Sequence, residues 1–143
     1  MEYTNLSGNK MTAKTIKVVE DFSAKPKGRY HPEDGDSSGE RFRDEYLIPE
    51  LTKAIREDRV LIVDLGGYNR YGPSFIDEAF GALASIANFD LEDLNKHLVI
   101  KHEALKSVVE SALSRMKFHN KNKKKIVESY EKRLQEKKRQ KTS

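Results

Sequence analysis

Apolar residues recur along this chain with two different periods, which predict strands in some segments and helices in others. The segment 60–65 is apolar on both faces, so it predicts a central strand covered by helices on one or both sides. Residues 15–22 alternate and are rich in β-branched side chains, and residues 97–101 form a short apolar run, so both predict further strands. Gly66 and Gly67 should end the central strand.

Three other segments have the apolar spacing of an amphipathic helix. The first starts near Ser37 and Glu40, which stand at capping-box spacing, and Pro49 either kinks this helix or starts a second one. The second helix opens at Ser74, and the third follows the strand at 97–101. The side chains expected to face the core are Phe42, Leu47, Ile48, Leu51 and Ile55 in the first, Ile76, Ala79, Phe80, Leu83 and Ala87 in the second, and Leu105, Val108, Val109, Ala112, Leu113 and Met116 in the third.

This order of elements predicts the α/β class, with a small, largely parallel sheet, helices packed on it and right-handed crossovers. Residues 1–13 have no apolar period and are expected to form a disordered or frayed lead-in. The α/β domain should then cover residues 14–116. Residues 117–143 have only a thin apolar stripe of Ile126, Tyr130 and Leu134, so we expect a basic helical or disordered tail.

Charge is divided unevenly along the 143 residues. The formal net charge is +4, but the last thirty residues hold 12 Lys and Arg against three acids, which leaves the preceding body acidic. The positive field that could attract nucleic acid therefore belongs to the tail.

Composition also excludes several classes of protein. The chain has no cysteine, so disulfides, thiolate catalysis and cysteine-ligated zinc are excluded. No apolar run reaches the ~20 residues of a membrane span, and residues 1–10 lack the apolar stretch of a secretory signal. We therefore expect a cytoplasmic protein that makes no contact with a membrane.

The best candidate for a site is the segment from Leu65 to Phe75, which leads from the carboxyl end of the central strand to the start of a helix. It lacks the spacing of a nucleotide-binding loop, so no cofactor is expected. Ser74 has two interpretations. With Asp77 three residues on, it can be a helix N-cap, or it can be a phosphorylation site whose charge would change a docking surface.

Catalysis and metal binding rank below these interpretations. Asp64, Asp77 and Glu78 are carboxylates, but no histidine lies near them in sequence and no metal-ligand spacing joins them. The four histidines are scattered, and Ser74 is not in a Gly-x-Ser-x-Gly turn. We expect no catalytic residue, no metal site and no enzyme.

Four blocks of the chain carry a resemblance to a known family. They are Gly28-Arg29-Tyr30, Ser38 to Arg43, Val63 to Gly67, and Tyr71 to Leu83, which contains Ser-Phe-x-x-Glu-Ala-Phe-Gly. The chain from about residue 16 to 116 resembles the bacterial STAS-like domain family, a family without an established activity.

This resemblance implies kinship with the STAS anti-sigma-factor antagonists, which bind a histidine-kinase-like ATPase and are switched off when it phosphorylates a serine. Ser74 matches that serine by position, although Gly72, Pro73 and Phe75 differ from the antagonists' Asp-Ser-Ser-Gly motif. The implied function is a non-catalytic regulatory interaction module with the ATPase as a separate chain. Its expected contact residues are Tyr68, Arg70, Tyr71, Gly72, Pro73, Ser74, Phe75 and Glu78.

An alternative from a different class is a nucleic-acid-associated protein that binds phosphates through its basic tail. Lys121, Lys123, Lys124 and Lys125 are the candidate contacts for that function. A charge run is more often a solvated helix face, and the chain has no nucleic-acid recognition motif.

Overall fold

The sheet has four strands in a computed structural model that describes residues 2–142. The strands stand in the order β1 (Glu2–Thr4), β2 (Lys10–Lys17), β3 (Val60–Asp64) and β4 (Leu98–Lys101). β1 runs antiparallel to β2, whereas β2, β3 and β4 are mutually parallel. The predicted α/β class with a small sheet and a central strand at 60–65 is confirmed.

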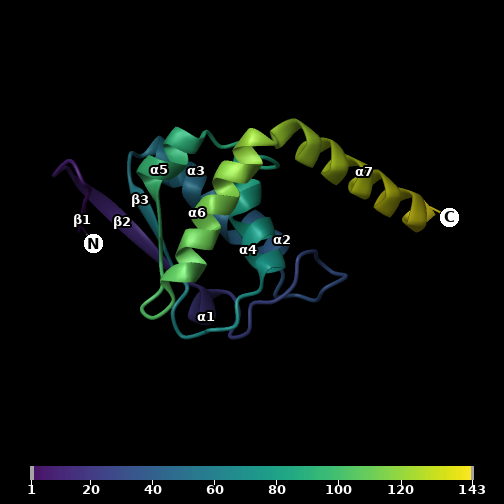
Figure 1. The fold of residues 1–143 in the computed structure, drawn as a ribbon, viewed down its shortest axis with the longest axis horizontal. Coiled ribbons are helices and arrows are strands. Elements are labelled where there is room, and N and C mark those ends of the chain that lie inside the picture. Colours follow the sequence, from purple (N-terminus) through teal and green to yellow (C-terminus); the bar gives the residue numbers. More distant parts are fainter. Residues whose placement is uncertain (1, 143) are drawn as a thin grey trace.

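Helices fill the connections between strands and the C-terminal third of the chain (Figure 1). The helical elements are α1 (Val18–Asp21), α2 (Gly39–Phe42), the π-helical turn η1 (Arg43–Leu47), α3 (Ile48–Arg56), α4 (Pro73–Ala79), the 3₁₀ turn η2 (Gly81–Ala84), α5 (Leu91–His97), α6 (Lys106–Lys121) and α7 (Lys123–Thr142).

The main core lies between one face of the sheet and these helices. Both parallel crossovers step the same way along the sheet, so right-handed connections put their helices on a single face. Phe42, Phe75 and Phe80 are fully buried there, against the strand residues Leu61 and Val63. A smaller apolar cluster on the other face contains Met11, Ala13, Val60 and Ile62.

The N-terminal segment differs from its prediction. Residues 2–4 pair with β2 in a hairpin, where a frayed lead-in was expected, because backbone pairing and the contact of Tyr3 with Met11 need no apolar period. β2 also begins earlier than the strand predicted at 15–22. The β-branched Val18 and Val19 belong to the short helix α1, with Val18 buried in the main core.

The first predicted helix is divided into three parts. Its cap is Ser38, one residue later than predicted, and Ser38 Oγ accepts a hydrogen bond from the Arg41 amide at 3.2 Å. Pro49 stands in the first turn of α3, where the missing amide costs little, so it begins a new helical segment. Leu47 and Leu51 are buried as expected.

Two glycines allow helices to approach closely. A Cβ atom added at Gly39 would lie 2.6 Å from the carbonyl oxygen of Phe75, so α2 can contact α4 only without a side chain there. A Cβ atom at Gly81 would lie 2.7 Å from Cδ2 of His119, which brings η2 against α6. One contact therefore packs α2 on α4, and the other packs α6 on the turn that follows α4.

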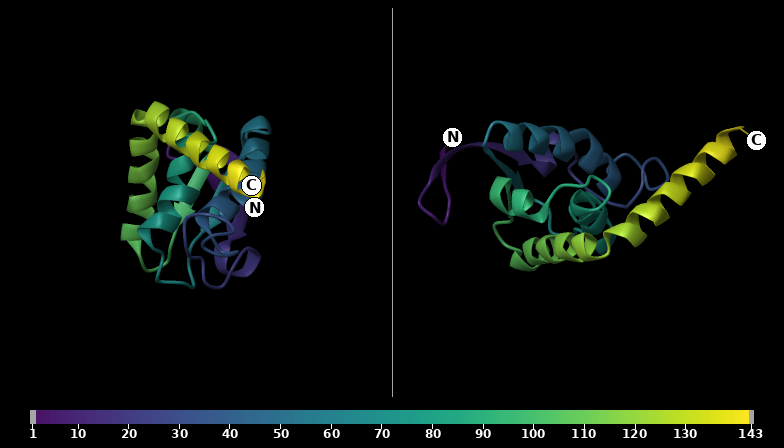
Figure 2. Two further views of the ribbon diagram at one scale, coloured as in Figure 1. Left: turned by 90° about the vertical axis from the view of Figure 1, so that its right-hand side faces the viewer. Right: turned by 90° about the horizontal axis from the view of Figure 1, so that it is seen from above.

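α7 lies outside the main core. None of its described side chains is buried, and its end projects from the body opposite the β1–β2 hairpin (Figures 1 and 2). The thin apolar stripe of Ile126, Tyr130 and Leu134 thus lies on α7, a helix that contacts the body mainly through polar groups. α6 extends beyond the predicted end at residue 116, to Lys121.

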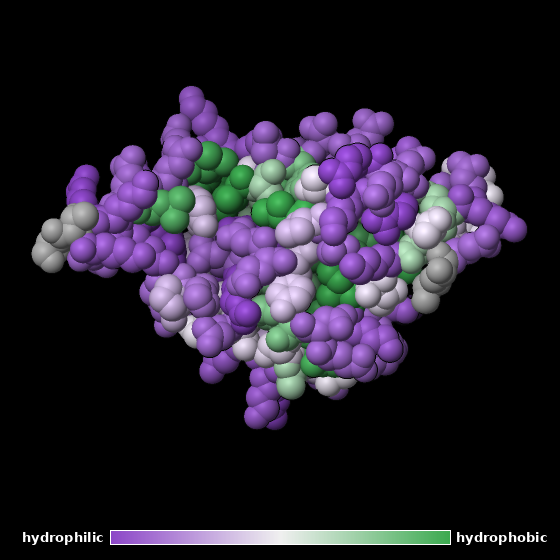
Figure 3. Space-filling view, turned by 180° about the vertical axis from the view of Figure 1, so that it is seen from behind, coloured by the Kyte–Doolittle hydropathy of each residue, from purple (hydrophilic) through white to green (hydrophobic). Residues whose placement is uncertain are grey.

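The surface seen from behind is mostly hydrophilic, with separate small hydrophobic patches (Figure 3). Among the described residues, the large apolar side chains that are exposed are Leu6, Leu113, Phe118 and Leu134. Leu113 was predicted to face the core and does not. No helix within residues 2–142 is long and apolar enough to cross a membrane.

Candidate functional site

The β3–α4 loop, residues 65–72, lies at the carboxyl edge of the parallel strands. The Gly66 amide donates to Asp64 Oδ1 at 2.9 Å, and the Gly67 amide donates to Glu103 Oε1 at 3.2 Å. Glu103 follows β4, the strand next to β3. Two neighbouring strand ends therefore support this loop, as expected where ligands bind to an open α/β sheet.

His102 fixes the middle of the same loop. Its Nδ1 accepts hydrogen bonds from the amides of Ala104 and Leu105, at 3.1 and 3.0 Å. The ring proton must then stand on Nε2, which donates to the Tyr68 carbonyl oxygen at 2.8 Å. His102 is therefore a positioning residue for the loop.

Tyr71 anchors the loop with its ring. It packs edge-on against Tyr68 and His102, with centroid separations of 5.1 and 6.4 Å, and it lies 5.8 Å from Phe75. Burial raises the pKa of Tyr71, and the nearby Asp64 adds to this effect, so its hydroxyl stays neutral. The aromatic contacts make this loop a rigid surface.

The eight predicted contact residues divide by exposure. Arg70, Pro73 and Ser74 are exposed, while Tyr68, Tyr71 and Gly72 are half-buried. With Lys27 from the facing loop, several of them line a depression of about 380 Å³. Phe75 and Glu78, by contrast, are buried, because the helical turn points them inward to the core and to Arg43. This corrects the predicted surface, which loses both residues.

Ser74 is not the N-cap of α4. The cap is Gly72, Pro73 occupies the first turn, and no side chain accepts a capping hydrogen bond. The cap predicted from the spacing of Ser74 and Asp77 is wrong, because the Asp77 side chain points inward and accepts hydrogen bonds from other segments. The Ser74 hydroxyl is exposed, and it makes no hydrogen bond to the described part of the chain.

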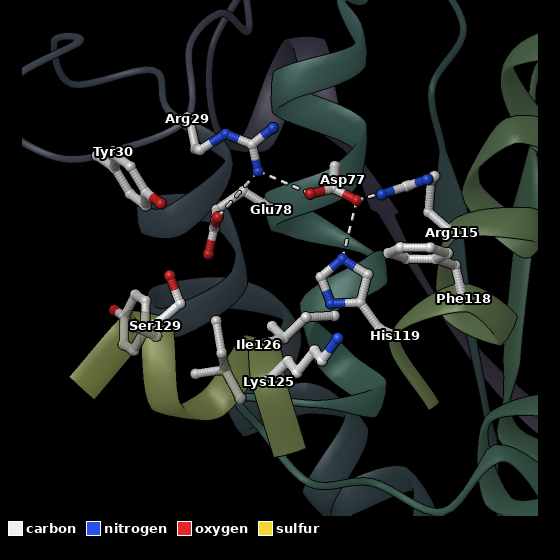
Figure 4. Close-up of a pocket in the computed structure, with 12 residues that line it drawn as sticks. Arg29, Tyr30, Asp77, Glu78, Arg115, Phe118, His119, Lys125, Ile126 and Ser129 are labelled. Atoms are coloured by element: carbon white, nitrogen blue, oxygen red, sulfur yellow. Dashed lines mark hydrogen bonds and ion pairs between the residues drawn. The ribbon is translucent and has the colours of Figure 1, made fainter. Parts of the chain in front are cut away.

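Asp77 is the centre of a polar cluster on the inner side of α4 (Figure 4). Its Oδ1 accepts from Arg115 Nε at 2.6 Å and from His119 Nε2 at 2.8 Å, and its Oδ2 accepts from Arg29 Nη1 at 2.7 Å. Burial disfavours the charge on Asp77, but the hydrogen bonds from His119, Arg29 and Arg115 outweigh it and hold the pKa of this carboxyl far below its usual range.

Glu78 is the second buried carboxylate of α4. Its Oε2 accepts from Arg43 Nη1 at 2.5 Å, and its Oε1 accepts from Arg29 Nη1 at 3.3 Å. Arg43 is itself 0% exposed, and its Nη2 lies 3.2 Å from the Tyr130 hydroxyl. The two acids thus connect four parts of the chain: η1, α6, the loop that precedes α2 and, through Arg43, α7.

Ser85, His119 and Asp77 have the residue types of a hydrolytic triad. His119 meets Ser85 Oγ through Nδ1 at 2.7 Å and Asp77 through Nε2, which reverses the usual use of the two nitrogens. Ser85 is only 1% exposed, so no substrate can reach its hydroxyl. The chain of hydrogen bonds instead fastens α6 to η2 and α4.

Sequence reasoning missed the basic half of this cluster, since Arg29, Arg115 and His119 lie 38 to 48 residues from Asp77. One signal was available: Arg29 and Arg43 belong to blocks that carry the family resemblance. Within residues 2–142, no group of three or more His, Cys, Asp or Glu side chains could hold a metal ion.

The four lysines proposed for nucleic-acid contact lie at the junction between α6 and α7. Lys121, Lys124 and Lys125 are exposed and Lys123 is half-buried. Further along α7, Arg133 and Lys137 both pair with Glu33, and Lys137 also donates to the His31 carbonyl oxygen. Part of the positive charge of the tail is therefore neutralised by the body, and nucleic-acid binding stays a prediction.

Comparison with known proteins gave a single finding. Residues 38–107 match the family model described as a STAS-like domain of unknown function (DUF4325). The match begins at the cap of α2 and ends at the start of α6, and it includes β3, the β3–α4 loop and both acids of α4. No curated protein and no solved structure matches the chain.

Proposed function

Because residues 38–107 carry a STAS-like domain of unknown function, we propose that this protein is a non-catalytic regulatory module that docks a partner protein on its β3–α4 loop surface. We define that surface as Tyr68, Arg70, Gly72, Pro73 and Ser74. The partner in this proposal is a separate histidine-kinase-like ATPase, and phosphorylation of Ser74 is the switch.

The observation that carries the proposal is the free hydroxyl of Ser74 on a rigid surface. A modifying enzyme needs a hydroxyl that is exposed and unpaired, and Ser74 meets both requirements within the described residues. The surrounding backbone is held by His102 and by the ring of Tyr71, so this loop would lose little conformational entropy when a partner binds it.

Charge explains how the switch would act. A phosphate adds about two negative charges to the first turn of α4, where the free amides tolerate an anion, so folding should be unaffected. The same charges would face the partner across a desolvated contact. Any acid opposite them would repel them, and the surface of the free module beside Arg70 and Lys27 would lose its net positive charge.

The test compares Ser74→Asp with Ser74→Ala and with Ser114→Asp, a matched control on an exposed serine of α6. Each variant is used to capture proteins from a host extract with and without ATP, the retained ATPase is identified, and its affinity is then titrated. We expect Ser74→Asp to weaken binding by at least about tenfold while Ser114→Asp binds as the wild type does.

Mass spectrometry after incubation with the purified ATPase and ATP supplies the second readout. Phosphate on Ser74 supports the switch. Undiminished binding by Ser74→Asp with no phosphate at Ser74 refutes it, and loss of binding by both aspartate variants would show that the effect is only one of net charge.

A further inference from the structure

A second cavity lies beside Asp77 and Glu78, about one turn along α4 from Ser74. Its lining includes no residue of the β3–α4 loop surface, so it is independent of the proposed docking. It encloses about 230 Å³ between α4, the end of α6, the start of α7 and the loop that holds Arg29. The view in Figure 4 has side chains from all four segments converging on this space.

The acceptors in this cavity are already occupied. Both oxygens of Asp77 and both oxygens of Glu78 accept hydrogen bonds from arginine or histidine side chains. A ligand that offers donors, such as a cation or an amine, would have to break these buried ion pairs.

The donors, in contrast, are only partly used. Arg29 and Arg115 each contact the acids through one nitrogen, which leaves their other N–H groups without a hydrogen-bond acceptor among the described residues. Lys125 Nζ and Ser129 Oγ also line the cavity, and neither makes an ion pair or hydrogen bond within residues 2–142. Three cations and one hydroxyl with unused donors therefore line the same cavity.

The remaining wall is apolar. Ile126 and Phe118 line the cavity beside these donors, and the guanidinium of Arg115 lies 4.2 Å from the centre of the Phe118 ring. The volume is smaller than that of a typical drug-sized pocket, which limits an occupant to one anionic group on a small body.

From this geometry we propose that the cavity binds a small molecule with a phosphate or carboxylate group, which contacts Arg29, Arg115 and Lys125, and with an apolar body, which packs on Ile126. Because Lys125, Ile126 and Ser129 belong to α7, the bound molecule would join α7 to α4 and α6. Ligand occupancy would then stabilise the position of α7 as well as fill the cavity.

The experiment uses the full chain and three probes of similar size: phenyl phosphate, benzoate and neutral benzyl alcohol. Calorimetric titration at constant ionic strength measures each affinity. We expect at least one anion to bind and benzyl alcohol to bind at least about tenfold more weakly, because charge-assisted hydrogen bonds supply most of the affinity. The tighter of the two anions identifies the preferred head group.

Two single-charge variants locate the site. Lys125→Gln removes a cation that lines the cavity, and Lys124→Gln removes its exposed neighbour, which does not. We expect Lys125→Gln to weaken the anion about tenfold and Lys124→Gln to leave the affinity within about twofold, with equal thermal melting of both variants.

Three outcomes would overturn the proposal. They are no binding of either anion at millimolar concentration, equal binding of benzyl alcohol, or equal loss of affinity in the two lysine variants, which would mean attraction to the tail charge alone.

Discussion

The Tyr130 hydroxyl donates a hydrogen bond to Glu40 Oε2 at 2.5 Å, across 90 positions of sequence. Glu40 is 6% exposed. The guanidinium of Arg43 lies over the ring of Tyr130, 5.4 Å from the ring centre. Burial and this hydrogen bond raise the pKa of Tyr130, which therefore remains a donor. α7, none of whose described side chains is buried, is thus joined to the body by the Tyr130 hydroxyl as well as by the ion pairs of Arg133 and Lys137.

Tyr130→Phe should lower the free energy of unfolding by about 1–2 kcal/mol, because it removes the hydroxyl and leaves the half-buried ring. The loss is measured by urea titration. Tyr46→Phe is the matched control: its hydroxyl has no hydrogen bond within residues 2–142, so its stability should be unchanged. Equal stability of both variants would mean that α7 is not held by this contact.

Phe80 should be among the most costly core residues to truncate. It is 0% exposed and packs against Phe42 with ring centroids 6.3 Å apart, so Phe80→Ala should cost about 3–5 kcal/mol. Phe118→Ala removes the same ring from a position 44% exposed and should cost less than about 1 kcal/mol. Chemical denaturation of the two variants tests the difference, and similar losses would contradict the assignment of Phe80 to the core.

Gly39→Ala should destabilise the protein, although alanine usually favours a helix over glycine. Its Cβ would lie 2.6 Å from the Phe75 carbonyl oxygen, and backbone must move to relieve the clash, at a cost of about 1–3 kcal/mol. Gly72→Ala adds the same methyl group into open space, and because Gly72 is the N-cap of α4 it should cost no more than about 1 kcal/mol. A stabilising Gly39→Ala, seen as a higher urea midpoint, would show that α2 and α4 are not in contact.

The elements that could be predicted from sequence were those whose signal is local. The apolar run at 60–65 and the spacing of Ile76, Phe80 and Leu83 predicted the central strand and the main helical contact, both confirmed by burial. α5 was missed because only Leu91 and Leu94 mark its apolar side. The hairpin at the N-terminus was missed because its stability comes from pairing with β2.

The site was predicted less completely because its geometry is nonlocal. The exposed part of the β3–α4 loop was expected from the end of a parallel strand, yet the spacing of Ser74 and Asp77 gave the wrong role for both. Pro73 was the available signal that α4 begins one residue earlier. The partners of Asp77 come from two other segments, and only the folded chain brings them together.

The last prediction concerns acid stability and the same carboxylate. In the native protein the pKa of Asp77 is held below its unfolded value, so the ionised form stabilises the fold above about pH 4. That contribution is lost as the pH falls below this value and Asp77 takes up a proton. The groups that face it are Arg29, Arg115 and His119, and all three favour its charge.

Asp77→Asn cannot take up that proton. This variant should be less stable than the wild type at pH 7, because the substitution removes the carboxylate charge. Its free energy of unfolding should, however, fall less steeply between pH 4 and pH 2. Urea titrations at several pH values measure both slopes. Asp93→Asn, on a half-buried carboxylate of α5 without an ion pair in the described residues, should keep the wild-type slope. Parallel curves for the wild type and Asp77→Asn would mean that the hydrogen bonds to Asp77 do not outweigh its burial.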